Sequence, residues 1–254
     1  MERGALNPIA LRITDVAMDA RSLSEFYATP LGQRSRRLIL RALRQSWPEV
    51  RDRRLLGYGF AEPYLRVFRS EAERTIAALP ESMSGALPWP REASLSTLVQ
   101  EDALPFPDAF FDLILVVHGL EEAEALRPLL RQLWRVLAPE GKLLLIAPNR
   151  ASLWAQIERS PFGRGRPFSR NELDALLRAA LFVPESWQRA LYAPPVASRV
   201  LTGSGAGWEK IGSRFFFSIG GVHIVEASKS LYAPARPKPV RVTAPALLKP
   251  AGTE

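Results

Sequence analysis

The sequence contains no cysteine, which excludes disulfide bonds, thiolate metal ligands and a cysteine nucleophile. It has only two histidines, His118 and His223, and their wide separation argues against the usual kind of zinc enzyme. No apolar run approaches the length of a membrane-spanning helix, and the N-terminus does not show a charged segment followed by an apolar one. We therefore expect a cytoplasmic protein with no metal and no membrane span.

Lysine is also scarce, since 29 of the 34 basic residues are arginine, and the net charge is +8. Eight arginines fall between Arg34 and Arg54, against the two acids Glu49 and Asp52. Such a stripe attracts phosphate polymers. However, Arg37, Arg41 and Arg44 share one helix face, and a solvated face is the simpler interpretation. A nucleic-acid partner is possible but not favoured.

At 254 residues the chain fits one α/β domain with an added element. We predict a helical lid segment over residues 1–50 and a Rossmann-like domain over 51–232. The remaining residues, 233–254, are rich in proline and basic residues and are predicted to form a disordered tail.

Hydrophobic patterns predict helices over residues 15–43 and 170–180, the first interrupted near Pro30–Gly32 and resuming from Gln33 toward Ser46. Ser169 and Glu172 have the spacing of a capping box. Predicted strands cover residues 54–60, 75–79, 96–99, 112–117, 143–147, 185–192 and 222–227. The last two are expected to form an antiparallel pair that closes one edge of the sheet.

Residues 101–149 carry the clearest signal. After the acidic pair Glu101 and Asp102 come the turn LPFPD, a buried strand from Asp112 to Val117, and a helix. The turn Pro139–Gly141 then leads into a second apolar strand. This strand–helix–strand unit builds parallel sheets, which bind ligands at the carboxyl ends of their strands.

The same stretch resembles the second half of a class I S-adenosylmethionine-dependent methyltransferase of the type 11-like subgroup, which includes quinone-biosynthesis methyltransferases. The phrases Leu104–Asp108, Phe111-Asp112 and Arg135–Gly141 stand here in the family's order. The resemblance implies a doubly wound, mostly parallel sheet with an antiparallel edge strand. It also implies S-adenosylmethionine as cofactor and methyl transfer to a small acceptor.

The expected cofactor turn is Gly57-Tyr58-Gly59-Phe60-Ala61, because small residues allow close approach of a ligand. The family pattern is incomplete around it. Leu55 replaces the usual acid two positions before the first glycine, and Leu79 stands where the second strand should end in an acid. Glu81 is the nearest acid there. Glu101 or Asp102 supplies the third expected acid.

His118, at the end of its strand, is the candidate base for methyl transfer, with a capping or packing role as the alternative. His223 lies inside an apolar strand and is interpreted as structural. Arg164 and Arg166 stand among aromatic residues in the Phe162–Phe168 loop, and could clamp an anionic or aromatic acceptor. Arg150 and Trp154 are predicted to join them. Phe26 and Tyr27 could form a lid, although core packing is favoured.

Two other functions stay open. The missing acids, the arginine stripe and the basic tail are compatible with a catalytically silent relative that binds a protein or nucleic acid. A dehydrogenase is the weaker alternative, because the turn has no third glycine and no acid ends the second strand.

Overall fold

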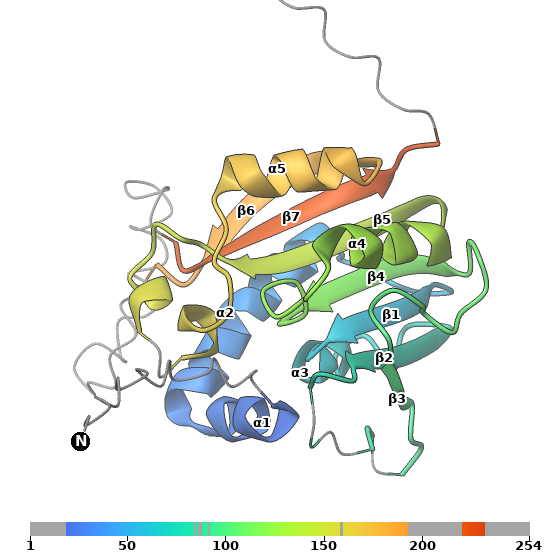
Figure 1. The fold of residues 1–254 in the computed structure, drawn as a ribbon. Helices are drawn as coiled ribbons and strands as arrows, with labels where there is room; N and C mark the ends of the chain where they lie inside the picture. The colour runs from blue at the N-terminus through green and yellow to red at the C-terminus, as the bar shows by residue number, and fades with distance from the viewer. Residues whose placement is uncertain are drawn as a thin grey trace, which may run out of the picture.

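The computed structural model describes residues 19–192, except 84, 86–87, 91 and 158–159, together with residues 220–231. This part of the chain forms a seven-stranded sheet in the order β3-β2-β1-β4-β5-β7-β6 (Figure 1). The strands are β1 (Arg54–Gly59), β2 (Arg74–Pro80), β3 (Ser96–Val99), β4 (Phe111–Val117), β5 (Leu137–Pro148), β6 (Phe182–Ala190) and β7 (Val222–Lys229).

Pairing is parallel from β3 through β5, and β7 runs antiparallel to both β5 and β6. The predicted doubly wound, mostly parallel sheet closed by an antiparallel pair is therefore confirmed. The reversed strand is β7, and β6 forms the edge itself.

β2 and β4 begin one residue earlier than predicted, and β5 and β6 begin several residues earlier, each of these two for a local reason. β6 starts at Phe182 because Pro184 lies at a shift in register, where a missing N–H is tolerated. β5 starts at Leu137, which pairs with Phe111 ahead of the Pro139–Gly141 turn.

The first two helices are α1 (Ala20–Ala28) and α2 (Pro30–Ser46). Asp19 caps α1 by accepting a hydrogen bond from the Ser22 backbone N–H, and Thr29 caps α2 in the same way through Gly32. The interruption is thus at Thr29, just before the predicted position, because proline is well suited to the first turn of a helix. A Cβ on Gly32 would lie 2.0 Å from the Phe26 carbonyl oxygen, so glycine permits the tight elbow.

The remaining helices are α3 (Glu62–Leu65), α4 (Leu126–Val136) and α5 (Arg170–Ala179), with short 3-10 turns at η1 (Trp154–Gln156) and η2 (Pro161–Gly163). Ser169 caps α5 as predicted, by accepting from the Glu172 N–H. Residues 1–18 and the predicted tail over 233–254 lie outside the described residues.

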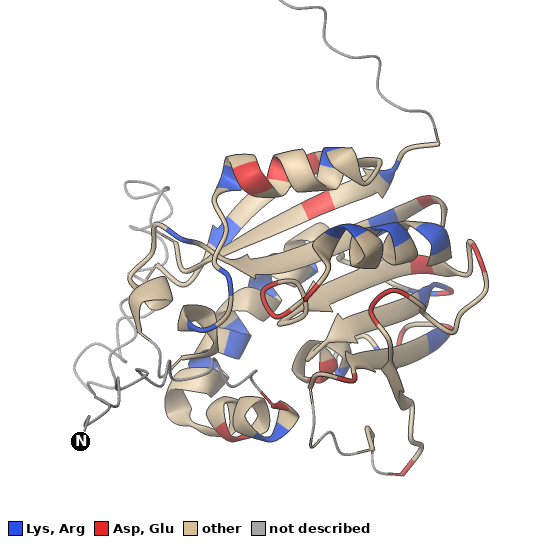
Figure 2. Ribbon diagram, viewed as in Figure 1, with Lys and Arg blue, Asp and Glu red and all other residues tan. Residues whose placement is uncertain are grey.

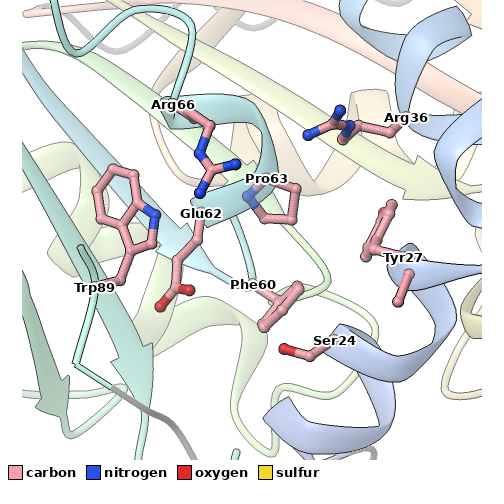
Figure 3. A pocket seen from close by; sticks show the side chains of 9 residues that line it. Ser24, Tyr27, Arg36, Phe60, Glu62, Pro63, Arg66 and Trp89 are labelled. Atoms are coloured by element: carbon pink, nitrogen blue, oxygen red, sulfur yellow. The ribbon is translucent and has the colours of Figure 1, made fainter. Parts of the chain in front are cut away.

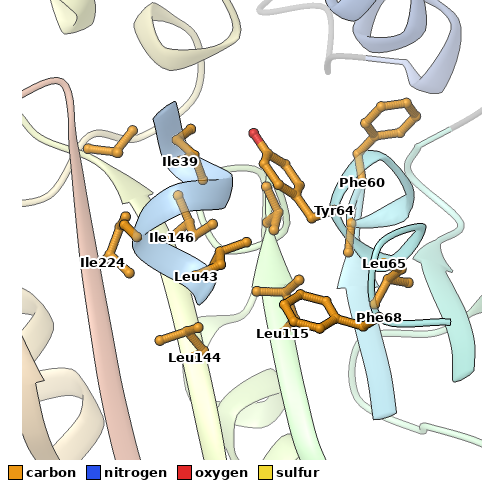
Figure 4. Packing of buried hydrophobic residues seen from close by; sticks show 14 of the residues in the cluster. Ile39, Leu43, Phe60, Tyr64, Leu65, Phe68, Leu115, Leu144, Ile146 and Ile224 are labelled. Atoms are coloured by element: carbon orange, nitrogen blue, oxygen red, sulfur yellow. The ribbon is translucent and has the colours of Figure 1, made fainter. Parts of the chain in front are cut away.

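The sheet is buried on both faces by two hydrophobic clusters. Helices α1, α2 and α3 cover one face, where Ile39, Leu43, Tyr64 and Phe68 pack against the strands (Figure 4). Helices α4 and α5 cover the other face, with Leu129, Leu133 and Leu177 as main contacts (Figure 1). None of the helices in the described ranges is long and apolar enough to cross a membrane.

Candidate active site

The strands β1 and β4 are neighbours in the sheet, and their carboxyl ends define the candidate site. The chain leaves β1 into α3 on one face of the sheet, and leaves β4 toward α4 on the other face. In open parallel sheets a ligand binds at such a reversal, because the two connections separate there. Gly59 ends β1, and His118 follows directly after β4.

His118 lies at the centre of a buried chain of hydrogen bonds and is only 3% exposed. Its Nδ1 lies 3.0 Å from Glu121 Oε1, and its Nε2 lies 2.8 Å from the Tyr27 hydroxyl. Tyr27 in turn is 2.9 Å from the hydroxyl of Tyr64. A carboxylate acceptor holds the proton on Nδ1, so Nε2 accepts the hydrogen bond that Tyr27 donates. Tyr64 then donates to Tyr27.

Aromatic rings enclose this chain. The His118 ring lies 5.2 Å from the Phe162 ring and 5.9 Å from that of Tyr27, which stacks on Phe60 at 6.0 Å. The backbone of His118 is left-handed, with φ of 50°, a conformation that costs a non-glycine residue about 1–2 kcal/mol. Such strain gathers at functional sites, although it does not by itself assign a function.

Burial sets the protonation of Tyr27, because removal from water raises the pKa of its hydroxyl well above the ordinary value, and neighbouring Tyr64 adds to the effect. Tyr27 therefore stays neutral near pH 7 and keeps the proton that it shares with His118. The core position favoured for Tyr27 on the sequence is confirmed.

A cavity of about 270 Å³ opens beside Tyr27, between α1, α2, α3 and the loop that carries Trp89 (Figure 3). Tyr27 and Phe60 supply aromatic wall. Its charged lining residues are Glu62 and Arg66 from α3 and Arg36 from α2. In Figure 3 the Glu62 carboxylate and the Ser24 hydroxyl point into this space, and Arg36 projects from the opposite wall.

Two polar groups of the cavity are incompletely paired within the described part of the chain. Burial raises the pKa of Glu62 from 4.5 to about 7. The Nε atom of Arg36 is buried without a hydrogen-bond partner among the described residues. Both groups can therefore bind a ligand that carries opposite charges.

The two glycines of the predicted cofactor turn are required by packing. A Cβ on Gly57 would lie 2.5 Å from Leu65 Cδ1, and one on Gly59 would lie 2.3 Å from the Val117 carbonyl oxygen. Ala61 is buried, and its carbonyl accepts from the N–H groups of Tyr64 and Leu65 in α3. None of these three residues lines the cavity, which instead receives the intervening Phe60 and the following Glu62.

The other predicted cofactor residues lie on the sheet face that α4 and α5 cover, or on the protein surface. The Tyr58 side chain packs in the cluster with α4, and burial raises the pKa of its hydroxyl, which has no partner among the described residues. Glu101 Oε2 accepts from the Glu124 N–H at 3.1 Å, while its buried Oε1 lacks a partner in the same part of the chain. Burial also raises the pKa of Glu101. Asp102 and Glu81 are exposed.

The predicted acceptor residues divide into two groups. Arg150 and Arg166 both bind the carboxylate of Glu172, and Arg166 lies over the Phe168 ring. Trp154 instead is 3% exposed and packs against Phe162. Arg164 is exposed on the same loop. The loop is tied to the His118 turn, because the Arg166 N–H donates to the Glu121 carbonyl at 2.9 Å.

Sequence reasoning missed Glu62, Arg36, Trp89 and Glu121. Glu121 follows His118 by three residues, and Glu62 follows the glycine turn directly, so position next to a predicted motif was a usable signal. No such signal pointed to Arg36 or Trp89, because they reach the cavity from segments distant in the sequence.

The basic stripe between Arg34 and Arg54 is partly engaged within the fold. Arg44 binds Glu71 and the Val67 carbonyl, Arg54 binds Asp112, and Arg51 pairs with Glu49. Figure 2 shows Lys and Arg on α2 and α4 and both signs of charge on α5. Within the described ranges no group of three His, Cys, Asp or Glu residues could hold a metal ion.

The sheet order, the reversal between β1 and β4 and the antiparallel closing pair define the class I methyltransferase fold. The model of the methyltransferase domain family matches residues 65–145. A methyltransferase of Thermotoga maritima, described as a possible histamine N-methyltransferase, superposes with a TM-score of 0.58 at 19% identity. The superposition covers 83% of this chain and 96% of that protein. At this identity the likeness shows the fold.

Two curated relatives share sequence. A demethylmenaquinone methyltransferase of Thermus thermophilus is 28% identical over 153 residues, which are 59% of this chain and 62% of the relative. The ubiquinone/menaquinone biosynthesis C-methyltransferase UbiE of Pectobacterium carotovorum is 47% identical over 45 residues, 18% of each protein. The chain thus spans less than two thirds of either relative. In its fold and over residues 65–145 it is similar to class I S-adenosylmethionine-dependent methyltransferases, whose cofactor is S-adenosylmethionine.

The described residues fit this cofactor in two places. The cavity offers opposite charges for an amino-acid end, and the orphaned Glu101 oxygen can accept a hydrogen bond at the end of β3. At the end of β2, Leu79 is buried and the next carboxylate, that of Glu81, is exposed. A cavity of about 270 Å³ is slightly below the usual 300–1,000 Å³ of ligand sites, so it accommodates part of such a molecule.

Proposed function

We propose that this protein transfers a methyl group from S-adenosylmethionine to a small acceptor whose nucleophilic atom carries a proton. The observation that supports this most is the buried chain Glu121–His118–Tyr27, which lies at the carboxyl end of β4 and borders the cavity through Tyr27. Buried histidine–carboxylate pairs hold and orient a base.

The cofactor supplies an activated methyl group on a positively charged sulfur. The protein holds it at the carboxyl ends of the strands, where the Gly57–Ala61 turn, Glu81, Glu101 and Asp102 stay the predicted contacts. We further propose that residues 1–50 form a cover over a domain of residues 51–232. In this arrangement Tyr27 and Arg36 are the cover's contributions to the cavity.

His118 does not line the cavity, so it acts through Tyr27. As the acceptor's proton moves to the Tyr27 oxygen, Tyr27 passes its own proton to His118 Nε2. The Glu121 carboxylate stabilises the resulting imidazolium. The acceptor's electron pair would form the new bond to the methyl carbon as the carbon–sulfur bond breaks, and the sulfur would leave as a neutral thioether. General base catalysis of this kind contributes about 10²–10⁴-fold to a rate.

The acceptor is proposed to be aromatic or anionic. The names of the relatives, which refer to demethylmenaquinone and ubiquinone, favour an aromatic acceptor. The Phe162–Phe168 loop supports an anionic one, with Arg164, Arg166, Arg150 and Trp154 as the proposed wall. For contact with an acceptor, Arg150 and Arg166 would have to share or leave the Glu172 carboxylate. The cytoplasmic location stays a prediction.

Calorimetry with S-adenosylmethionine tests the first step, and absence of binding at millimolar concentration would refute the proposal. With a phenolic acceptor panel and a labelled methyl donor, Glu121→Gln should slow transfer by roughly tenfold or more and change the pH profile. Glu122→Gln removes the neighbouring charge and should leave both unchanged. Equal rates in the two variants would refute the role of the Glu121–His118 pair as the general base.

A catalytically silent relative is the second candidate. It is favoured by Leu55 and Leu79, both buried where the family places acids. This function predicts no cofactor binding, but a mobility shift with nucleic acid that weakens as salt increases, or a stable complex with a protein partner.

A further inference from the structure

The cavity between α1, α2 and α3 presents a carboxylate and a guanidinium on opposite walls, Glu62 from α3 and Arg36 from α2 (Figure 3). Apolar and aromatic surface from Phe60, Pro63 and Trp89 lies around them. Among the described residues no hydrogen bond or ion pair joins Glu62 to Arg36 or Arg66, and burial alone perturbs the Glu62 carboxyl.

An α-amino acid end carries the complementary pair of charges, an ammonium and a carboxylate a few ångströms apart. We propose that Glu62 binds the α-ammonium group of the methyl donor, and that Arg36 binds its α-carboxylate. The assignment rests on the proposed function, and it gives this chain an acid for the donor although Leu55 and Leu79 supply none.

Desolvation supports this role. A carboxylate that is partly withdrawn from water, with a pKa raised to about 7, is stabilised in its charged form by an arriving ammonium. The charged groups that line the cavity with it are Arg36 and Arg66, and the titratable Tyr27 is neutral. Binding of the amino-acid end at pH 6 should therefore release close to one proton from Glu62. At pH 8 the carboxylate is already ionised, and release should be small.

The experiment compares two ligands by calorimetry. S-Adenosylhomocysteine has the amino-acid end, and 5′-methylthioadenosine has the same nucleoside without it. Glu62→Gln should weaken binding of the first about ten- to hundredfold and leave the second within about twofold. The proton release, measured in two buffers of different ionisation enthalpy, should disappear.

Arg36→Gln should weaken the binding of S-adenosylhomocysteine by a similar factor, but binding to this variant should still release a proton. The matched control is Glu25→Gln, which removes an exposed acid of α1 that does not line the cavity. This variant should bind both ligands with the affinity of the parent.

The outcomes separate the two proposals. If Glu62→Gln binds S-adenosylhomocysteine as the parent does and still releases a proton, the Glu62 assignment is wrong, while the methyltransferase function stands. If the parent protein binds neither compound, both are wrong. Loss of both compounds in a folded Glu62→Gln variant would also overturn the assignment, because the amino-acid end would not be what Glu62 recognises.

Discussion

Replacing Gly59 by alanine tests whether the β1–β4 contact is as close as the structure has it. Gly59 has φ of +76°, and an added Cβ would lie 2.3 Å from the Val117 carbonyl oxygen and 2.8 Å from Gly119. A left-handed alanine costs about 1–2 kcal/mol. Overlap with backbone that cannot move away adds roughly 1–3 kcal/mol. We expect Gly59→Ala to lose about 2–5 kcal/mol of unfolding free energy.

Two other glycines separate these contributions. Gly85 has φ of +74°, and among the described residues its added Cβ would meet only Arg21 Cβ, at 3.8 Å, so Gly85→Ala reports the backbone strain. Gly57 has no left-handed backbone, but its Cβ would overlap Leu65 and Ala61, so Gly57→Ala reports the overlap alone. Gly85→Ala should therefore lose about 1–2 kcal/mol, and Gly57→Ala about 1–3 kcal/mol.

Chemical denaturation of the three variants is the assay, with calorimetric melting as a check, where each kcal/mol corresponds to roughly 2–4 °C. If Gly59→Ala loses no more than Gly85→Ala, the close approach of β1 to the end of β4 is refuted. If Gly57→Ala and Gly59→Ala keep their stability but lose cofactor binding, the two glycines serve the ligand and not the packing.

Two further predictions concern Arg135 and the titration of the core. Arg135 donates to the Leu104 and Phe106 carbonyls, so Arg135→Lys should lose roughly 2–4 kcal/mol in denaturation, against under about 0.5 kcal/mol for the exposed Arg131→Lys. An equal loss in both would contradict this. Burial raises the pKa of Glu62 from 4.5 to about 7, so folded Glu62 keeps a proton that the unfolded chain has lost, and stability falls with rising pH across that window. Burial lowers the pKa of His223 from 6.5 to about 4, with the opposite slope between those values. Unfolding free energies at about pH 5, 6 and 7 should therefore rise more steeply in Glu62→Gln than in the parent, and equal slopes would contradict the raised pKa of Glu62.

Sequence patterns predicted most of the sheet because each strand's apolar run and each cap is a local signal. Ser169 capped its helix as expected, and β3 matched its predicted residues. The site was less predictable. His118 could be named because it ends a strand, but Tyr27 comes from α1, 91 residues earlier. Only packing brings these two side chains together, and no pattern in a single sequence records a contact over that distance.

The phrases that carry the family resemblance turn out to hold the fold rather than the chemistry. Asp112 of the Phe111-Asp112 phrase accepts from the Arg54 backbone N–H and guanidinium, which ties the amino ends of β4 and β1 together. Arg135 of the Arg135–Gly141 phrase fixes the turn LPFPD through its carbonyls and Asp108.

These contacts lie at the amino ends of the strands. His118 and the cavity lie at the opposite, carboxyl end of the sheet. A chain could keep every one of them and still bind no cofactor. Of the two departures, Leu79 falls near the carboxyl end of β2, where ligands bind, whereas Leu55 follows Arg54 near the amino end of β1. The resemblance therefore supports the fold more strongly than the activity, and the activity depends on whether Glu62 and Arg36 supply the charges that the usual positions lack.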